Sequence, residues 1–374
     1  MKILMTAANL FPPRGGAERS LFTLAERMSK DFNVTIIGPG NENFERKEEG
    51  YKIISIKKPF FFKLIKSYVK INIQNLWWKK VLEKFLKENK FDLLITQGIL
   101  VPSCKGKGIS IKKVIFIRGL TFYTQTDLDP LEFKGKDFFK LNFLMKVQYP
   151  LIKYFQKKGR ESSKEFDLII SNSEFIRKVT NAYLGKDSEI IYPPINIKEY
   201  YVEKRKPEYI LFVNPIISKG VDMMYNLAKS MPDKKFLVVG KPDIYSKKDY
   251  NRLKKLKNIS FEGYILNMKN IYSKTKLLVC PVRWYEPFGR TPAEAMVNGI
   301  PSIVSDRGGL PEVVKNAGDI IKNRDNIDEW IKTIKKYDNQ EYYNKKSQLC
   351  KEQVKKFSLE NQYKKLKKIL ITLK

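Results

Sequence analysis

Short apolar runs that alternate with helix-like segments are the feature of this sequence that most constrains its fold. Each run is three to seven residues long, which suits a buried strand, and the segments between them repeat apolar residues at helical spacing. Strands that alternate with helices form a mostly parallel sheet whose two faces are covered by the helices. The sequence therefore predicts an α/β chain built from doubly wound, Rossmann-like domains.

The alternation occurs twice along the chain, with a break near residue 193. In the first series we expect strands at 2–8, 34–37, 52–56, 93–96, 114–117, 168–171 and 189–192, and helices at 17–30, 68–89, 140–165 and 173–184. In the second series we expect strands at 209–213, 235–239, 259–261, 277–280 and 302–305, helices at 220–230 and 248–256, and a mostly helical tail from Asn326.

The break itself indicates a domain boundary. Pro193-Pro194 and the charged run 197–207 resemble a linker, and 374 residues suit two domains. We therefore expect an N-terminal domain at 1–195 and a C-terminal domain at 196–357, both Rossmann-like and facing each other across a cleft. The apolar stripe of a last helix predicts that 358–374 packs back on the first domain; the stripe consists of Leu359, Tyr363, Leu366, Leu370 and Leu373.

Composition excludes several classes of site. The chain has no histidine, and its three cysteines lack metal-ligand spacing, so neither a zinc site nor a Ser-His-Asp triad is expected, and no metal is predicted. No signal peptide and no membrane-spanning run is evident, which predicts a cytoplasmic protein with reduced thiols. The net charge of +32 favours anionic partners such as nucleic acid, an acidic membrane face or phosphorylated small molecules, although solvated surface lysines also account for much of it.

The stretch 282–314 carries the strongest chemical signal. Glu286 and Glu294 stand eight positions apart, and glycine turns at Gly289 and Gly308-Gly309 each lead into an expected helix. Free amides at such helix starts suit a phosphate, and nearby acids suit sugar hydroxyls. Glu294 has an alternative role, because Thr291 to Glu294 has the form of a capping box. Glu286 has no comparable structural explanation.

Weaker motifs stand at other strand ends. Gly15-Gly16 leaves room for a phosphate but also suits a plain turn, and Lys219-Gly220 offers a cation that also suits an ordinary surface lysine. The amides of residues 308–310 suit an anion or a simple helix cap. Arg118 suits a phosphate or an acceptor group, or an ion pair with Asp127 or Asp129.

Lysines alternate with aromatic residues between Lys57 and Lys90, where Phe60, Phe61, Phe62, Trp77 and Trp78 lie. This composition is typical of a surface that lies on anionic lipid. A helix whose aromatic residues face the core explains it equally well.

Taken in order, these motifs resemble the family-4 retaining glycosyltransferases, which have the GT-B fold. The resemblance rests on GGAE, SNSEF, a strand before KG, FEGY, and EPFG…EAMVNGIP…GGLPE, and it extends from Met1 to about Phe357. It implies an enzyme of the hexosyltransferase type that uses a UDP- or GDP-linked sugar and no further cofactor.

The resemblance also implies roles for individual residues. Lys219 would contact the diphosphate, the amides of Phe288 and Gly289 would lie near the phosphates, and Glu286 would lie near the transferred sugar. Glu294 would bind the ribose hydroxyls, while Tyr264 and Ile265 would read the base through their backbone. Gly15 and Gly16 would approach the phosphates from the first domain.

Two departures from the family pattern stand out. Asn214-Pro215 replaces the usual Gly-Arg pair, and Arg290 is our first choice to supply the missing cation, ahead of Arg283 and Arg307. The usual histidine is absent where Arg118-Gly119 stands, and we expect Arg118 to act there. A retaining reaction needs no strong protein base, because the leaving phosphate can take the acceptor's proton.

The sequence thus predicts a retaining glycosyltransferase that moves a sugar from a nucleotide donor to a glycan, lipid-linked or polysaccharide acceptor. The basic aromatic segment adds an anionic surface at the inner membrane face as a partner. Two alternatives are a GT-B-fold sugar-nucleotide epimerase and a basic nucleic-acid-binding protein. No helix-turn-helix or stacking signature supports specific nucleic-acid binding.

Overall fold

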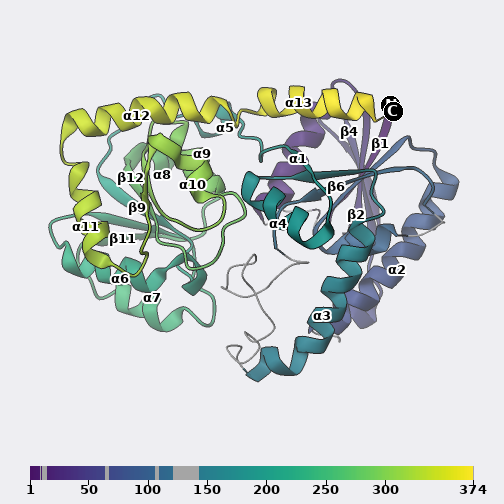
Figure 1. Cartoon of the computed structure of the whole chain (residues 1–374), viewed down its shortest axis with the longest axis horizontal. Coiled ribbons are helices and arrows are strands. Elements are labelled where there is room, and N and C mark those ends of the chain that lie inside the picture. The colour runs from purple at the N-terminus through teal and green to yellow at the C-terminus, as the bar shows by residue number, and fades with distance from the viewer. Residues whose placement is uncertain (9, 11–14, 64–66, 106–108, 121–142, 374) are drawn as a thin grey trace. The chain divides into compact units, whose positions relative to one another are not determined.

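The computed structural model describes residues 1–374 except 9, 11–14, 64–66, 106–108, 121–142 and 374 (Figure 1). The chain forms two compact units. Unit 1 consists of Met1–Pro194 and Gln362–Lys374, and unit 2 consists of Ile195–Asn361. Each unit has its own, mostly parallel sheet with helices on both faces, so the predicted α/β class is confirmed.

The sheet of unit 1 has the order β3-β4-β2-β1-β5-β6-β7-β8. Its neighbouring strands are parallel except for the β3–β4 hairpin, which turns at Glu49-Gly50 through positive φ angles. The sequence did not predict β3, because FERKE is an exposed and charged edge strand without apolar alternation. The strands are β1 Lys2–Thr6, β2 Asn33–Gly40, β3 Phe44–Glu48, β4 Tyr51–Lys57, β5 Leu93–Gln97, β6 Lys112–Ile117, β7 Leu168–Ser171 and β8 Glu189–Ile190.

Helices cover the two faces of this sheet. One face packs against α2 (Ser67–Glu88), α3 (Phe143–Ser163) and α4 (Glu174–Leu184), where Trp78 and Phe155 are fully buried. The other side carries α1 (Gly16–Met28) and the chain's last helix, α13 (Leu359–Thr372).

The last helix is held on unit 1 by a polar cluster at the end of α1. Tyr363 donates a hydrogen bond of 2.5 Å to Asp31, and the Lys367 ammonium lies 2.8 Å from the other oxygen of that carboxylate. Arg27 stacks on the Tyr363 ring at 4.1 Å. Tyr363, Leu366 and Leu370 are buried, as the apolar stripe predicts.

The sheet of unit 2 has the order β11-β10-β9-β12-β13-β14, and all neighbouring strands are parallel. Sequence patterns predicted every strand but β14, which has three residues and is too short to show periodicity. The strands are β9 Tyr209–Val213, β10 Phe236–Val239, β11 Ile259–Glu262, β12 Thr275–Cys280, β13 Ser302–Ser305 and β14 Asp319–Ile321.

Two helical layers enclose this second sheet. One layer packs around Trp330 and contains α6 (Val221–Ser230), α7 (Lys247–Leu253) and α11 (Ile327–Lys336). The other contains α9 (Arg290–Met296), α10 (Leu310–Val314) and α12 (Gln340–Lys355), with the short helices α5 (Ile197–Tyr200) and α8 (Lys269–Lys274) beside α9. Single 3-10 turns lie at Phe60–Lys63, Gly98–Cys104, Ile217–Lys219 and Lys315–Ala317.

The segment 197–207 differs from the predicted linker, because it is packed on unit 2. It begins with α5, and Val202 donates its amide to the Asn298 side chain at 2.8 Å. The Arg205 guanidinium donates to three backbone carbonyls, those of Tyr272, Thr275 and Asn298. Arg205 therefore anchors the segment to unit 2.

Candidate active site

Lys219 reaches the carboxyl edge of the unit 2 sheet through a tight turn after β9. The 3-10 turn Ile217–Lys219 ends at Gly220, whose φ of 84° lies in the left-handed region. A Cβ atom on Gly220 would stand 2.0 Å from the Pro281 carbonyl oxygen, so only glycine fits. The turn after β9 thus lies directly against the end of β12, where Glu286 follows.

Glu286 is fixed by the loop after β13. A Cβ on Gly308 would stand 2.2 Å from the Glu286 carbonyl oxygen, and the Gly309 amide donates to that oxygen at 2.7 Å. The Leu310 amide donates to the Arg307 carbonyl at 3.4 Å. The sequence left an anion cradle and a helix cap open for the amides of residues 308–310; those of Gly309 and Leu310 donate to carbonyl groups within the protein.

Lys219 and Glu286 form an ion pair, with side chains 22% and 16% exposed. The Trp284 indole N–H donates a hydrogen bond of 2.8 Å to the same Glu286 oxygen that accepts from Lys219. The Lys219 ammonium also lies 4.8 Å from the centre of a Trp284 ring. Trp284 therefore holds both charged groups at one place, in a setting poorer in water than the surface.

Glu294 is 7% exposed, and its carboxylate does not cap a helix. The capping interpretation is wrong, because α9 begins at Arg290 with Gly289 as its N-cap and no side chain caps it. Thr291 consequently lies inside the helix. Glu294 instead accepts from the Arg290 Nε at 3.0 Å and from the Tyr272 hydroxyl at 3.3 Å.

Arg290 and Glu294 form the second buried ion pair of this region, one turn apart on α9. The Arg290 guanidinium also donates to the Tyr200 hydroxyl at 3.3 Å. Burial alone would lower the pKa of Arg290, but the charge of Glu294 and the contact with Tyr200 outweigh it and raise that pKa. The Arg290 side chain is therefore a permanent cation anchored by Glu294.

A small cavity of about 40 Å³ adjoins both ion pairs within unit 2. Its lining includes Lys219, Glu286, Arg290, Asn214 and Cys280. Burial raises the pKa of the Cys280 thiol to about 12, so this thiol stays protonated and is no nucleophile.

Asn214 has a φ of 61°, a left-handed conformation that asparagine tolerates better than most residues. It occupies the place of the glycine in the family's usual Gly-Arg pair, and Pro215 brings no cation. The backbone at this departure from the family pattern therefore has the left-handed conformation that glycine adopts most easily.

Of the other predicted residues of unit 2, Gly289 lines this cavity, whereas Tyr264, Ile265 and Phe288 are not among its described lining. Tyr264 is 58% exposed and follows the edge strand β11 together with Ile265. The Phe288 side chain is buried and packs edge-on against Phe357 at 5.2 Å. Gly289 has a φ of 102° and is the N-cap of α9.

The predicted residues of unit 1 lie at the carboxyl edge of that unit's sheet. Gly15 is the N-cap of α1, and Gly16 is its first residue. Arg118 follows β6 and lines a cavity of about 280 Å³ with Gln97, at the end of β5, and with Glu18, in the first turn of α1. Its guanidinium stacks on Phe116 at 4.7 Å. Asp127 and Asp129, its suggested ion-pair partners, lie outside the described residues.

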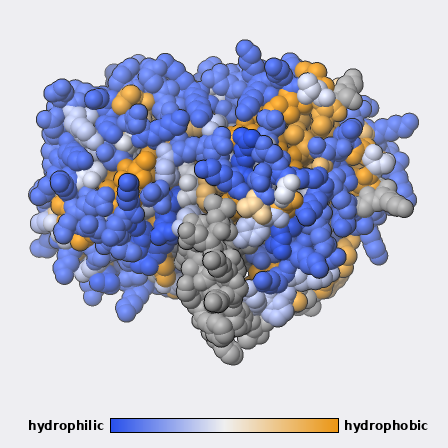
Figure 2. Space-filling view, in the orientation of Figure 1, coloured by the Kyte–Doolittle hydropathy of each residue, from blue (hydrophilic) through white to orange (hydrophobic). Residues whose placement is uncertain are grey.

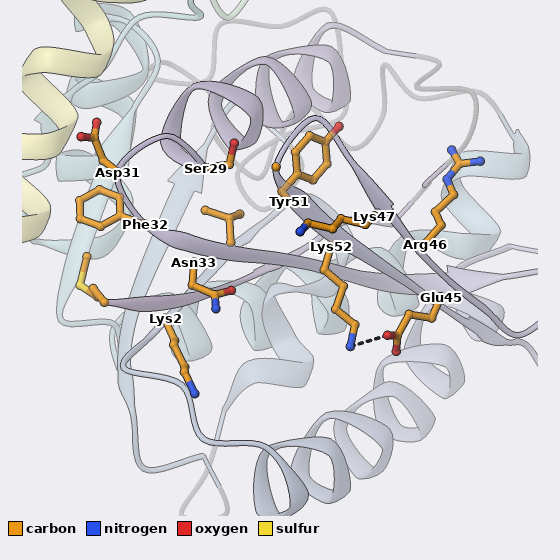
Figure 3. Close-up of a pocket in the computed structure, with 13 residues that line it drawn as sticks. Lys2, Ser29, Asp31, Phe32, Asn33, Glu45, Arg46, Lys47, Tyr51 and Lys52 are labelled. Atoms are coloured by element: carbon orange, nitrogen blue, oxygen red, sulfur yellow. Dashed lines mark ion pairs between the residues drawn. The ribbon is translucent and has the colours of Figure 1, made fainter.

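A wider cavity of about 870 Å³ lies at the opposite edge of unit 1, and Figure 3 shows the residues around it. Lys2 and Asn33 are the first residues of β1 and β2, and the β3–β4 hairpin contributes an ion pair of 2.6 Å between Lys52 and Glu45. This cavity contains none of the predicted site residues. In doubly wound sheets ligands bind at the carboxyl ends of strands, so it is not the candidate site.

Two negative findings apply to the described part of the chain. It contains no group of three histidine, cysteine, aspartate or glutamate side chains placed to hold a metal ion. None of its helices combines the length and the apolarity that a membrane crossing requires.

Two protein-family models match the chain. The model described as "Glycosyl transferases group 1" matches residues 195–357, and the one described as "Glycosyltransferase Family 4" matches residues 14–199. The chain is a group 1 glycosyltransferase of the GT-B fold. The family predicted from the sequence is thereby confirmed.

Relatives of this glycosyltransferase are distant in sequence. An uncharacterized 42.6 kDa protein in the cps region of Klebsiella pneumoniae is 24% identical over 84% of this chain and 87% of its own. A Campylobacter jejuni alpha-1,4-N-acetyl-D-galactosaminyltransferase, named for a diNAcBac-PP-undecaprenol-linked substrate, is 25% identical over 74% of this chain and 72% of its own.

Solved structures share the fold of the glycosyltransferase at lower identity. Sucrose-phosphate synthase from Thermosynechococcus elongatus superposes with a TM-score of 0.75 at 15% identity, covering 100% of this chain and 98% of its own. Anabaena Alr3699/HepE in complex with UDP-glucose gives a TM-score of 0.72 at 14% identity, with both chains fully covered.

Three residues of the glycosyltransferase's site escaped the sequence analysis. Trp284 stands two positions before Glu286, so an aromatic donor beside the predicted acid was a usable signal. Tyr200 and Tyr272 come from α5 and α8, two short helices without clear periodicity. Their contacts with Arg290 and Glu294 depend on the fold and could not be predicted from the local sequence.

Proposed function

We propose that this glycosyltransferase transfers a hexose from a UDP- or GDP-linked donor, with retention of configuration, to the hydroxyl of a glycan or lipid-linked acceptor in polysaccharide or glycolipid synthesis. The observation that carries the proposal is the pair Lys219–Glu286 beside the pair Arg290–Glu294 in one pocket of unit 2. A cation for phosphate and a carboxylate for sugar hydroxyls stand within hydrogen-bonding distance of each other there.

The donor would be held by the residues that the family resemblance assigns. Its diphosphate would compete with Glu286 for Lys219, which frees the carboxylate to accept from sugar hydroxyls. Arg290 would add a second cation, while Glu294 would accept from the ribose. Tyr264 and Ile265 would pair with the base, and the amides of Phe288, Gly289, Gly15 and Gly16 would lie near the phosphates.

Retention is supported by the chemistry of the described pocket. It offers no histidine, and its one unburied acid lies against a lysine, so no strong base is in place. In the proposed step the bond from the anomeric carbon to the phosphate oxygen breaks, and the acceptor oxygen bonds to that carbon on the same face. The acceptor's proton passes to the departing phosphate, whose charge Lys219 and Arg290 stabilise.

The choice of donor and acceptor draws on what the similar proteins are named for. The Anabaena protein was solved with UDP-glucose, and the Campylobacter protein is named for a lipid diphosphate-linked glycan. Both fit a protein of net charge +32, whose partners are expected to be anions.

A thermal-shift panel of UDP-, GDP- and ADP-sugars tests the donor. At about a hundred times its Kd the true donor should stabilise the fold by about 2.7 kcal/mol, and the Lys219→Met variant should lose that shift. Anomeric NMR of the product then tests retention. An inverted product would overturn the mechanism, and a new sugar nucleotide formed without acceptor would identify an epimerase instead.

We further propose that the protein is cytoplasmic and that unit 1 binds peripherally to the inner membrane face. Phe60 and Phe61 are 71% and 45% exposed beside Lys57 and Lys58, whereas Phe62 and Trp78 belong to the core. Figure 2 shows apolar patches set in a mostly hydrophilic face.

Flotation with phosphatidylglycerol vesicles tests this proposal. The vesicles should carry the protein upward, and the double variant Phe60→Glu, Phe61→Glu should bind the vesicles more weakly. An absence of binding at low salt would remove this proposal.

A further inference from the structure

Three arginines lie at the carboxyl ends of three adjacent strands in unit 2, outside the small cavity described above. Arg283 follows β12, Arg307 follows β13 and Arg324 follows β14. The arginines belong to the edge of the sheet where a doubly wound domain binds its ligands. Neither the family resemblance nor the ion pairs of the candidate site assign a role to Arg324.

The segment 283–286 separates this arginine cluster from the candidate site, because its side chains alternate in what they contact. Trp284 and Glu286 both contact Lys219. Arg283 and Tyr285 have other partners: Arg283 pairs with Asp222 on α6, and Tyr285 accepts a hydrogen bond of 2.5 Å from Arg307. One short segment therefore borders both groups of residues.

Arg324 is the deepest member of the cluster. Its side chain is only 6% exposed, and among the described residues its Nη1 atom is buried without a hydrogen-bond partner. Its Nη2 atom pairs with Asp325, whose side chain is 76% exposed. A buried guanidinium nitrogen without an acceptor costs free energy, so its retention needs an explanation.

The surroundings of Arg324 concentrate positive charge. Burial and then the charge of Arg283 lower the pKa of Arg324, and Arg307 acts in the same direction. Burial alone would raise the pKa of Asp222, but the bonds to Arg283 and the charges around it lower it, so this carboxylate stays ionised. With Asp222 and Asp325 counted against the three arginines, the cluster keeps a net charge of +1.

The Arg283 side chain is 38% exposed and Arg307 is half-buried, so a solute can reach these two guanidinium groups, which border the buried Arg324, from solvent. We propose that Arg283, Arg307 and Arg324 form an oxyanion site that takes a phosphate or carboxylate group, with Arg324 Nη1 as a donor that the anion completes. Planar guanidinium groups bind both anions in the two-point manner that lysine cannot offer.

This site would make the glycosyltransferase selective for a substrate with an anionic group apart from the donor's diphosphate, and this assignment to a substrate rests on the proposed function. The group would be either a phosphate of a lipid-linked acceptor or a carboxylate of an acidic sugar. Anion binding itself depends only on the cluster.

Isothermal titration of the full chain with inorganic phosphate and, separately, with glucuronate tests the site. Lys219→Met removes the proposed donor cation and should keep millimolar binding of one of the two anions. Adding Arg324→Met to it should weaken that binding about tenfold or more, since a charge-assisted pair is lost. Arg252→Met, which removes a paired arginine on α7, is the matched control and should leave the titration unchanged.

The two anions distinguish the sources, because phosphate binding indicates a phosphorylated substrate and glucuronate binding an acidic sugar. Arg307→Gln gives the same test if Arg324→Met does not fold. Failure of both anions to bind, or binding that is unchanged in the Arg324 and Arg307 variants, would overturn the site. Loss of the nucleotide-sugar shift with anion binding intact would instead count against the proposed function alone.

Discussion

The candidate residues of the two units are held in different ways. In unit 2 the charged side chains bind one another: Lys219 pairs with Glu286, Arg290 pairs with Glu294, and the adjoining cavity measures about 40 Å³. In unit 1 Arg118 stacks on Phe116 beside a cavity of about 280 Å³. Unit 2 thus presents paired charges that a ligand must compete for, whereas the described lining of the unit 1 cavity encloses more space and includes Arg118.

This difference suggests a division of labour. Groups that are already oriented contribute most where charge develops in the transition state, because they need no reorganisation. A roomier pocket whose described lining includes Arg118 suits recognition of a variable acceptor. The predictions below test this contrast, beginning with the largest effect.

Loss of the Lys219–Glu286 pair should have the largest effect on activity. Lys219→Met and Glu286→Gln should each lower kcat/KM by roughly 10²–10³, because each removes a group that acts on the leaving group or the sugar. The double variant should be little worse than either single one, since the residues act as a unit. Steady-state transfer assays measure the effect, and a melting temperature near the wild-type value shows that the fold persists.

Two results would contradict this prediction for Lys219 and Glu286. Either single variant with nearly full transfer activity would remove Lys219 and Glu286 from the reaction. Strictly multiplicative losses in the double variant would show that the two side chains work independently and that their ion pair is incidental.

Glu294 should matter first for stability. Glu294→Ala leaves Arg290 buried without its carboxylate, and breaking a buried pair in this way costs about 3–5 kcal/mol. Glu294→Gln keeps oxygen and nitrogen atoms in place and is the matched control, expected to lose less. Thermal unfolding measures the difference, and nucleotide titration of the Gln variant tests whether the ribose also depends on this side chain. An Ala variant as stable as the wild type would contradict the structural role.

Glu294 also illustrates where sequence reasoning failed. Thr291-Pro292-Ala293-Glu294 matches a capping box letter by letter, and that pattern predicted a helix beginning at Pro292. In the structure α9 begins at Arg290, after Gly289 in a left-handed conformation. The local pattern was overridden because Glu294 finds stronger partners in Arg290 and in Tyr272, which lies 22 positions earlier.

By contrast, most of the fold could be predicted from the sequence. Buried strands such as Phe236–Val239 are continuous apolar runs, so their positions can be read directly. Elements without periodicity, such as β3 and β14, could not be found in this way. Glu286 and Lys219 could be singled out as residues, but their pairing depends on Gly220 and Gly308 admitting close backbone contacts, which only the structure reveals.

Trp284 should have a smaller effect, through Glu286. Trp284→Phe removes the indole donor 2.8 Å from the carboxylate and keeps an aromatic face for Lys219. We expect about a tenfold loss in kcat with the donor Kd nearly unchanged, in line with one charge-assisted hydrogen bond. Trp284→Leu should lose more, because the cation–π contact disappears as well. Equal activity of the Phe and Leu variants would show that the ring plays no part.

Arg118 in unit 1 should affect the acceptor rather than the chemistry. Arg118→Met should raise the acceptor KM several-fold, by about 1 kcal/mol for one lost polar contact, and leave the donor-induced thermal shift intact. Kinetics with the acceptor varied at saturating donor measure the effect. A fall in kcat as deep as that of the Lys219 variant would break the proposed contrast, because both units would then supply charge to the transition state.

The smallest expected effect is a pH-dependent loosening of the last helix, α13, from unit 1. Hydrogen bonds from Lys367 and then Tyr363 lower the pKa of Asp31 from 3.8 to about 2. A lowered folded-state pKa means that this anchor is complete above about pH 4 and is lost as the pH falls toward 2. Asp31→Asn should reproduce the loss at neutral pH. Amide hydrogen exchange should then quicken in α13 around Tyr363 and Leu366 but not in α12, whose own contacts are untouched. Unchanged protection of α13 would show that its apolar stripe suffices to hold it on unit 1, and that the contacts of Asp31 do not stabilise this packing.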